Sequence, residues 1–392
     1  MNRTMKNLLG YYRERGISPV LYKMKTWKDH FERRDAVYRS IGLPPFAFRG
    51  SSILEIAPGS GQNSVYLASQ EPASLDLVEP NEVALADIKR VYGDLDFPYV
   101  EPTVHPVTVE QFKTDKQFDV VICENWLGLS AEECDIRTQI SKFVAPGGLL
   151  ITTAVPYTGF LPNVIRTVLA ACITDQDMPF DEQVAFLVGA FGPHLDTMPE
   201  MTRTHEDWVK DCLLNPFYLN VALPLTMIAE DVGDEFEFCG TVPRFSQDWR
   251  WFKSLTGENR SFNAHIFDEM SANRHNFISH RHLFDARSQE KNKVLEDGAI
   301  NIHNLAMTVG ESVRGNKAVP TSTLEDIGRS IAEMVENINE FSPQIAAGFK
   351  EVRDLLLQDK IAAQDIASMS AFNSLFGREM MYVSLIRREV WA

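Results

Sequence analysis

Short apolar runs alternate with amphipathic stretches between about residues 50 and 155. The apolar runs have the length and composition of buried strands, and the stretches between them have helical spacing. This alternation is typical of a parallel sheet whose strands are joined by crossover helices. We therefore predict an α/β, doubly wound sheet with strands at 52–57, 74–79, 118–123 and 148–154 and a weaker strand near 99–104.

The segments before and after the first strands of this sheet are predicted to be helical. Apolar positions recur near helical spacing from about Pro19 to Ile41, which indicates an N-terminal helical arm. Between residues 158 and about 233 the strand pattern stops, which indicates a helical insertion, and 235–240 is predicted to return the chain to the sheet. An insertion after the fifth strand lies beside the ligand crevice, so this one is a candidate substrate lid. The connecting helices of the sheet are expected to begin at Gly61, Asn81 and Ser130.

The last part of the chain has the pattern of a helical bundle. A capping box at Ser322–Glu325 precedes one apolar stripe, a second striped helix follows Pro343, and a third, rich in Met and Phe, runs toward Trp391. Such stripes are typical of a bundle core or of a homo-oligomer interface. The predicted domains are therefore the arm at 1–49, a domain at 50–250 that contains the insertion, and a helical C-terminal domain at 251–392.

Composition narrows the classes of function. A length of 392 residues allows two or three domains, and a formal net charge of -16 disfavours nucleic acid as a partner because binding to phosphate backbones depends on Lys and Arg. The five cysteines are widely spaced, without a C-x-x-C pair, which fits a reducing cytoplasm. No stretch approaches the roughly 20 apolar residues of a membrane span, and the first thirty residues do not have the pattern of a signal peptide.

Candidate chemistry lies at the ends of the first two predicted strands. Gly59 and Gly61 follow the first strand, where a missing Cβ lets the backbone approach a nucleoside-containing cofactor closely. Glu55 would lie at the mouth of the crevice, where its carboxylate can hold a positively charged or amino-bearing ligand. Glu79 ends the second strand about twenty residues after the glycine turn, where an acid can accept hydrogen bonds from two ribose hydroxyls. Alone, these residues are also compatible with an ordinary strand-to-helix turn and a solvated strand end.

Two further segments stand in the order that the same cofactor would require. Phe118–Glu124 has the pattern of a fourth strand with an acid at its end, and Ala145–Gly148 has the pattern of a turn before the fifth. As a set, residues 50–155 resemble the class I S-adenosylmethionine-dependent methyltransferase family, whose sheet is Rossmann-like. The whole chain is also faintly similar to bacterial methyltransferases of surface-polysaccharide or specialised metabolism.

The resemblance implies a cofactor, S-adenosylmethionine, and a role for each matching residue. The sequence departs from the family at Ala57, where a glycine is usual, and at Val107, near where an acid or a polar group often contacts the adenine. The implied contacts are Glu55, Ala57, Pro58, Gly59 and Gly61 for the methionine part, Glu79 and Pro80 for the ribose, Val107 and Thr108 for the adenine, and Glu124 and Asn125 for the sulfonium.

The expected reaction is a metal-independent, in-line transfer of the methyl group to an O or N atom of a small molecule or glycan precursor. Glu124 is the candidate base, Asn125 a polar positioning residue, and His194 in the predicted lid a secondary catalytic candidate. The histidines at 275, 280 and 282 lack metal-ligand spacing, so no metal is expected. Asp248–Lys253 has the composition either of a cradle for an anionic or sugar acceptor or of an interdomain plug.

Two other functions compete with this one. A cofactor-binding protein that has lost catalysis and acts as a regulator or scaffold would carry the same motifs. An NAD-dependent oxidoreductase would use G-x-G-x-x-G at the same turn, but the third position here is Ser64, and Glu55 has no role in a nicotinamide site.

Overall fold

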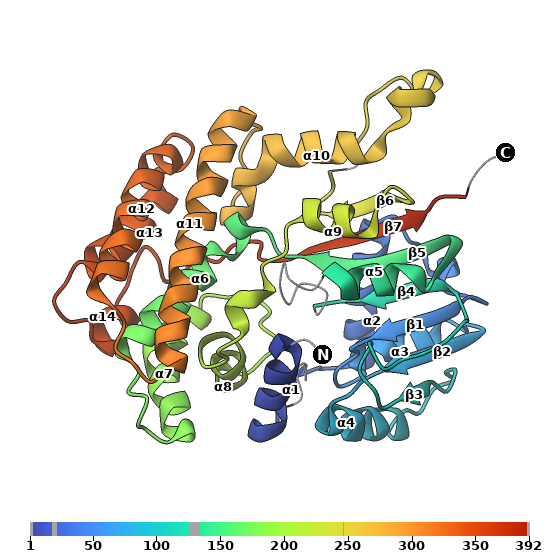
Figure 1. Cartoon of the computed structure of the whole chain (residues 1–392), viewed down its shortest axis with the longest axis horizontal. Helices are drawn as coiled ribbons and strands as arrows, with labels where there is room; N and C mark the ends of the chain where they lie inside the picture. Colours follow the sequence, from blue (N-terminus) through green and yellow to red (C-terminus); the bar gives the residue numbers. More distant parts are fainter. Residues whose placement is uncertain (1–2, 18–21, 126–133, 246, 390–392) are drawn as a thin grey trace. The chain divides into compact units, whose positions relative to one another are not determined.

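The computed structural model describes residues 3–17, 22–125, 134–245 and 247–389 (Figure 1). The chain forms two compact units. The first comprises Met1–Val155, Val221–Met270 and Met381–Ala392, and the second comprises Pro156–Asn220 and Ser271–Met380. The predicted insertion at 158–233 therefore contributes to both units.

A seven-stranded sheet forms the centre of the first unit, in the order β3-β2-β1-β4-β5-β7-β6. The first five strands along the chain pair in parallel, whereas β7 is antiparallel to both β5 and β6. Because the chain winds from β1 toward β3 and then from β4 outward in the other direction, crossover helices cover both faces. The predicted α/β, doubly wound, Rossmann-like fold is confirmed. The strands are β1 (Ser52–Ile56), β2 (Ser74–Val78), β3 (Thr103–His105), β4 (Phe118–Cys123), β5 (Val144–Ala154), β6 (Phe236–Val242) and β7 (Met381–Arg387).

The fifth strand begins earlier than the sequence predicts. The expected turn at Ala145–Gly148 lies inside β5, where the pairing with β4 shifts from Phe118 opposite Val144 to Val120 opposite Leu149. The extra residues on β5 are accommodated by an irregularity in which Gly147 has a φ of 74°. The prediction of a turn before the strand is therefore wrong, because this glycine pair bulges from the strand without ending it.

The helices of the first unit begin largely where the sequence predicts. Gly61 is the N-cap of α3, and Asn81 is the N-cap of α4, with its side-chain oxygen accepting from the Val83 N–H at 3.0 Å. The third predicted start, Ser130, lies outside the described residues. The arm contains two helices instead of one from 19 to 41. The helices are α1 (Arg3–Arg15), α2 (Trp27–Ser40), α3 (Gln62–Ser69), α4 (Glu82–Gly93), α5 (Cys134–Lys142), α9 (Leu225–Val232) and α10 (Phe262–Asn273), which continues into the second unit.

The second unit is built from helices. Its first helices come from the predicted insertion and the others from the C-terminal region, and none among the described helices is long and apolar enough to cross a membrane. They are α6 (Tyr157–Ile173), α7 (Phe180–Leu195), α8 (His205–Trp208), α11 (Gln289–Arg314), α12 (Thr321–Asn339), α13 (Pro343–Leu356) and α14 (Ala363–Ala367).

Two details of the C-terminal prediction are wrong. The N-cap of α12 is Pro320, so Ser322 lies within the helix and cannot act as the N-cap of a capping box. The segment that runs toward Trp391 is the strand β7 over Met381–Arg387, drawn in red between β5 and β6 in Figure 1. Its residues 381, 383, 384 and 385 are buried, as expected for a strand that lies between two others in a sheet covered on both faces.

The N-terminal arm is part of the core of the sheet. Tyr38 and Ile41 belong to the same buried cluster as Ile53 of β1. The Ile41 carbonyl accepts a hydrogen bond from the Ser384 hydroxyl at 2.6 Å, and it lies against Gly240 of β6. The end of α2 is therefore fixed to the two strands at that side of the sheet.

The close approach of Ile41 to β6 requires a glycine at position 240. A Cβ at this position would lie 2.4 Å from the Ile41 carbonyl oxygen, so we expect Gly240→Ala to lower the free energy of unfolding. The expected loss is about 1–3 kcal/mol, the cost of overpacking a rigid contact. Chemical denaturation measures it, with Gly93→Ala as the control, since nothing lies within 4 Å of a Cβ at the end of α4. Equal stability of the two variants would contradict the prediction.

Candidate functional site

Two buried carboxylates stand at the carboxyl ends of neighbouring strands. Glu55 lies near the end of β1, opposite Ile122 of β4, and Glu124 directly follows β4. In each, one carboxylate oxygen (Oε2) is buried without a hydrogen-bond partner among the described residues. A buried carboxylate oxygen without a partner is costly. The pair therefore forms a site that a positively charged, hydrogen-donating group would satisfy.

The loop after β1 has three residues in left-handed conformation. Ala57, Gly59 and Gly61 have φ angles of 55°, 59° and 77°. The Ala57 N–H donates to the Val78 carbonyl at 2.9 Å, and a Cβ on Gly61 would lie 2.9 Å from Cγ1 of Ile88. Gly61 is thus required both by its conformation and by its packing, whereas Ala57 holds a conformation that costs an L-residue about 1 kcal/mol. Such strain is often found at ligand sites.

Glu79 joins the loops that follow β1 and β2. Its Oε2 accepts from the Gly59 N–H at 3.1 Å and its Oε1 from the Asn81 N–H at 2.8 Å. Burial raises the pKa of Glu79 to about 7, although both backbone hydrogen bonds favour the charged form. The structure thus brings Glu79 to the glycine loop, as the sequence predicts for a ribose-binding acid, and gives it a role in shaping that loop.

Glu124 is held by residues that the sequence analysis did not single out. Nη2 of Arg34 donates to Oε1 of Glu124 at 2.5 Å, and the Tyr38 hydroxyl donates to the same oxygen at 3.3 Å. The side chains of Arg34 and Glu124 are each 6% exposed. The available signal was the spacing of His30, Arg34 and Tyr38, which places them on one face of α2, the face that is buried.

The N-terminal arm also contacts the loops after β1 and β2. Gln62, the first residue of α3, accepts from the Tyr22 N–H at 2.7 Å and donates to the Tyr22 carbonyl at 3.2 Å. Nη2 of Arg13 donates to the Pro80 carbonyl at 2.8 Å, and Nδ2 of Asn81 donates to the Ile17 carbonyl at 3.3 Å. Together with the Arg34–Glu124 contact, these hydrogen bonds therefore tie the arm to three of the four loops that carry candidate residues, those after β1, β2 and β4.

The remaining candidates of the first unit lie at the ends of β3 and β4. Asn125 is exposed, has a φ of 61°, and its N–H donates to Oγ1 of Thr153 at 2.8 Å. Val107 and Thr108 are half-buried in the loop after β3. At the start of this loop, the carbonyl of His105, the last residue of β3, accepts a hydrogen bond from the Glu79 N–H at 3.1 Å. Glu110 in the same loop has a buried carboxylate oxygen without a partner among the described residues, an acid that the sequence analysis missed.

His194 belongs to the second unit and does not join these residues. Its ring is fully buried in α7, with Nε2 2.9 Å from the Ile366 carbonyl and Nδ1 3.4 Å from Nε of Arg166. Burial, with the positive charge of Arg166, lowers the pKa of His194 to about 4. A buried ring with both nitrogens engaged has no free nitrogen for a proton from an acceptor, so the proposed function does not use His194.

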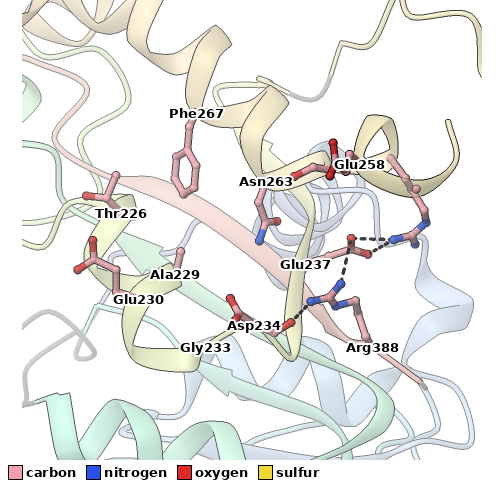
Figure 2. A pocket seen from close by; sticks show the side chains of 13 residues that line it. Thr226, Ala229, Glu230, Gly233, Asp234, Glu237, Glu258, Asn263, Phe267 and Arg388 are labelled. Atoms are coloured by element: carbon pink, nitrogen blue, oxygen red, sulfur yellow. Dashed lines mark hydrogen bonds and ion pairs between the residues drawn. The ribbon is translucent and has the colours of Figure 1, made fainter. Parts of the chain in front are cut away.

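A pocket of about 510 Å³ lies elsewhere in the first unit, among α9, β6 and α10 (Figure 2). Asp234 and Glu237 stand at the start of β6, which runs in the same direction as β5 because both are antiparallel to β7. These residues are thus at the amino ends of the strands, away from Glu55 and Glu124. The buried Glu237 already accepts two hydrogen bonds from Arg260, at 2.7 and 2.8 Å.

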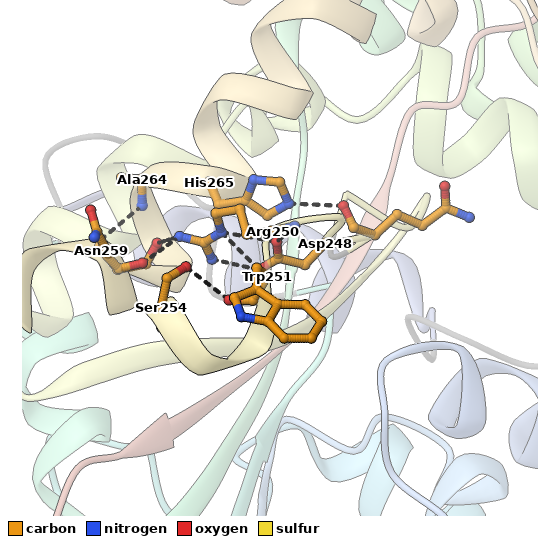
Figure 3. Close-up of polar contacts among 9 residues, drawn as sticks. Asp248, Arg250, Trp251, Ser254, Asn259, Ala264 and His265 are labelled. Carbon is orange, nitrogen blue, oxygen red and sulfur yellow. Dashed lines mark hydrogen bonds and ion pairs between the residues drawn. The ribbon is translucent and has the colours of Figure 1, made fainter. Parts of the chain in front are cut away.

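Two charged residues of the predicted cradle at Asp248–Lys253, Asp248 and Arg250, are paired with each other (Figure 3). Arg250 donates to both carboxylate oxygens of Asp248 and, at 2.7 Å, to the Asn259 carbonyl. Trp249 is 94% and Trp251 63% exposed. The segment is an ordered loop that presents aromatic side chains to solvent, and its role as a cradle or a plug stays a prediction.

No family model matches this chain, and no curated protein matches it by sequence. Among solved structures, it is similar to magnesium protoporphyrin IX methyltransferase from Synechocystis with bound S-adenosylmethionine, at 15% identity and a TM-score of 0.33 over 40% of this chain and 78% of that one. It is also similar to DhpI with S-adenosylhomocysteine (20% identity, TM-score 0.30, 39% and 70% covered). A third similar structure is the N-methyltransferase NodS from Bradyrhizobium japonicum with S-adenosylhomocysteine, at 19% identity and a TM-score of 0.29 over 40% of this chain and 74% of that one. These similarities cover part of the chain, and we base the proposed function on the geometry of the site.

The conformation of Ala57 yields a test of strain in the glycine loop. Glycine adopts a φ of 55° without the steric cost that alanine meets, but it loses more entropy on folding. We therefore expect Ala57→Gly to leave the free energy of unfolding unchanged or to raise it by up to about 1 kcal/mol. Ala57→Val should lower it by more than about 1 kcal/mol, because a β-branched residue is strongly disfavoured at positive φ. Denaturant titration separates these outcomes, and a large loss of stability in Ala57→Gly would contradict the assignment.

The buried Glu55 predicts a pH dependence of stability. Burial raises the pKa of Glu55 to about 7 from its ordinary value of 4.5, so the folded protein keeps this proton to a higher pH than the unfolded chain. The free energy of unfolding should therefore fall as the pH rises from about 4.5 to 7, with Glu79 contributing in the same direction. Glu55→Gln should remove part of this fall. In Glu32→Gln, which alters a side chain that is 66% exposed, the fall should remain.

Proposed function

We propose that this protein binds S-adenosylmethionine and transfers its methyl group to an O or N atom of a small molecule or glycan precursor. The observation that carries the proposal is the pair of buried carboxylates, Glu55 and Glu124, each with an oxygen that has no partner among the described residues. They flank the point where the winding of the sheet reverses, which is where doubly wound folds bind ligands. A cofactor that carries an ammonium and a sulfonium supplies positive charge in addition to that of Arg34, which contacts Oε1 of Glu124.

The other residues fit the same cofactor. Glu55 and the backbone of Ala57, Pro58, Gly59 and Gly61 are assigned to the methionine part. Glu79 and Pro80 are assigned to the ribose, because each carboxylate oxygen of Glu79 accepts one backbone hydrogen bond and has a further lone pair for a hydroxyl. Val107 and Thr108 are assigned to the adenine, and Glu124 and Asn125 to the side of the sulfonium.

When bound, the cofactor supplies a methyl carbon that is already activated by its sulfonium. What the chain must add is alignment, which can contribute several kcal/mol, about 7–11 at the extreme. Its fixed parts are a rigid loop at Ala57–Gly61, a buried Glu124 that Arg34 holds, and a helical arm that ties the loops together. Burial of both carboxylates keeps water away from the charges, which strengthens their interaction with a cation.

Isothermal titration calorimetry with S-adenosylmethionine, S-adenosylhomocysteine and NAD tests this function. We expect the first two to bind and NAD not to bind. Glu79→Ala should weaken the binding of S-adenosylmethionine at least tenfold, about 1.4 kcal/mol, because it removes the ribose acceptor and loosens the glycine loop. Glu333→Ala, at an exposed position of α12, is the control.

Two outcomes would contradict the proposal. Binding of NAD alone would identify an oxidoreductase. Tight binding of S-adenosylmethionine, with no methyl acceptor in a broad screen of metabolites and glycan precursors, would identify a regulatory protein that retains the cofactor site without catalysis.

A further inference from the structure

Arg34 is a buried cation on a helix of the N-terminal arm, outside the sheet. It lies in the middle of α2, and its guanidinium carbon is 4.7 Å from the centre of the Tyr38 ring and 5.9 Å from the centre of the Tyr382 ring. Its ion pair with Glu124 connects positions 90 residues apart in the chain. A solvated arginine on a helix surface costs little, but burial of this one requires a compensating charge. Glu124 supplies that charge.

Glu124 faces charged and titratable groups from four elements. Arg34 and Tyr38 come from α2, Tyr382 from β7, Glu55 from β1 and Cys123 from β4. Among the described residues, Arg34 is the cation of this group, and it contacts Oε1 of Glu124 while Oε2 has no partner there. One oxygen is therefore fixed by the arm, and the other remains for a ligand.

We propose that Arg34 is a positioning residue for the methyl-donor site, an inference that rests on the proposed function. It holds Glu124 in place through Oε1, so that Oε2 meets the positive charge of the bound cofactor. In this arrangement Glu124 acts as a fixed negative charge and not as the general base that the sequence analysis considered. The arm thereby completes the site, although none of its residues belongs to the motifs of the parallel strands.

The Arg34–Glu124 ion pair should affect the binding of S-adenosylmethionine and of S-adenosylhomocysteine differently. S-adenosylmethionine carries a positive sulfur, whereas the sulfur of S-adenosylhomocysteine is neutral, so a correctly placed Glu124 favours the first. Without the guanidinium, Glu124 is a buried carboxylate without its partner, and it is no longer held in place. Arg34→Met should therefore weaken the binding of S-adenosylmethionine at least tenfold and that of S-adenosylhomocysteine much less. A merely structural role of Arg34 would weaken both alike.

The experiment compares five variants, including Arg34→Met, with the wild type by calorimetry. Arg34→Lys should recover part of the selectivity, because it restores the charge without the planar fork of the guanidinium. Glu124→Gln should lose the selectivity, and the double variant Arg34→Met/Glu124→Gln should match it, since Arg34 acts through that charge. The double variant also leaves no unpaired buried charge, so it tests the proposal if Arg34→Met does not fold. Arg33→Met, an exposed neighbour on α2, is the control and should bind both ligands as the wild type does.

The outcomes separate the two proposals. If the wild type binds S-adenosylmethionine and Arg34→Met keeps its selectivity, the positioning role is wrong and the proposed function stands. If the double variant differs from Glu124→Gln, Arg34 does not act through Glu124, and the positioning role is again wrong. If the wild type binds neither ligand, the proposed function fails and the positioning role fails with it.

Discussion

The parallel pairing of β1 with β4 determines where chemistry can take place in this protein. These strands are neighbours in the sheet, yet the chain leaves β1 toward β2 and leaves β4 toward β5. The connections therefore diverge at the carboxyl ends of the two strands and leave a crevice between them. Glu55 and Glu124 are adjacent there because of this topology, and a shift of one residue in the pairing would turn Glu55 to the other face of the sheet.

The negative charges of two neighbouring buried carboxylates must be compensated, and Glu55 and Glu124 are compensated in different ways. Glu124 forms an ion pair with Arg34, whereas Glu55 has no ion-pair partner within the described part of the chain, and burial raises the pKa of Glu55 to about 7. Without a ligand, Glu55 is therefore partly protonated near neutral pH. A cationic ligand would ionise Glu55 as it binds and release a proton.

The sequence was informative where a local pattern implies a local structure. The apolar runs of β1, β2 and β4 were predicted nearly to the residue, as was the N-cap at Asn81, because these depend on a few neighbouring residues. Glu55, Glu79 and Glu124 could be placed at the crevice because strand ends in a parallel sheet meet at one edge. The partner of Glu124 could not be found in this way, since nothing local shows that Arg34, on the buried face of α2, reaches the residue that follows β4.

Long-range contacts also explain the other differences between the sequence-based predictions and the structure. The segment at Met381–Arg387 has enough Met, Leu and Ile for either a helix or a strand, and it is a strand because β5 and β6 flank it. His194 had a suitable residue type for catalysis, but spacing does not show whether a ring nitrogen is free. In the structure, Arg166 and the Ile366 carbonyl engage the two ring nitrogens of His194. In each case the outcome depends on residues more than a hundred positions away or on packing that periodicity does not encode.

The position of β7 between β5 and β6 has a consequence for how the protein is made. The sheet cannot close around this strand until residue 387 has left the ribosome, and by then every segment of the second unit has been synthesised. The helical unit can therefore fold during translation, while the sheet that begins first in the chain is completed last. Until then β5 exposes an unpaired edge, which is a hazard for aggregation. In the cell, a helical unit that folds early and chaperones that cover this edge would both favour the native protein.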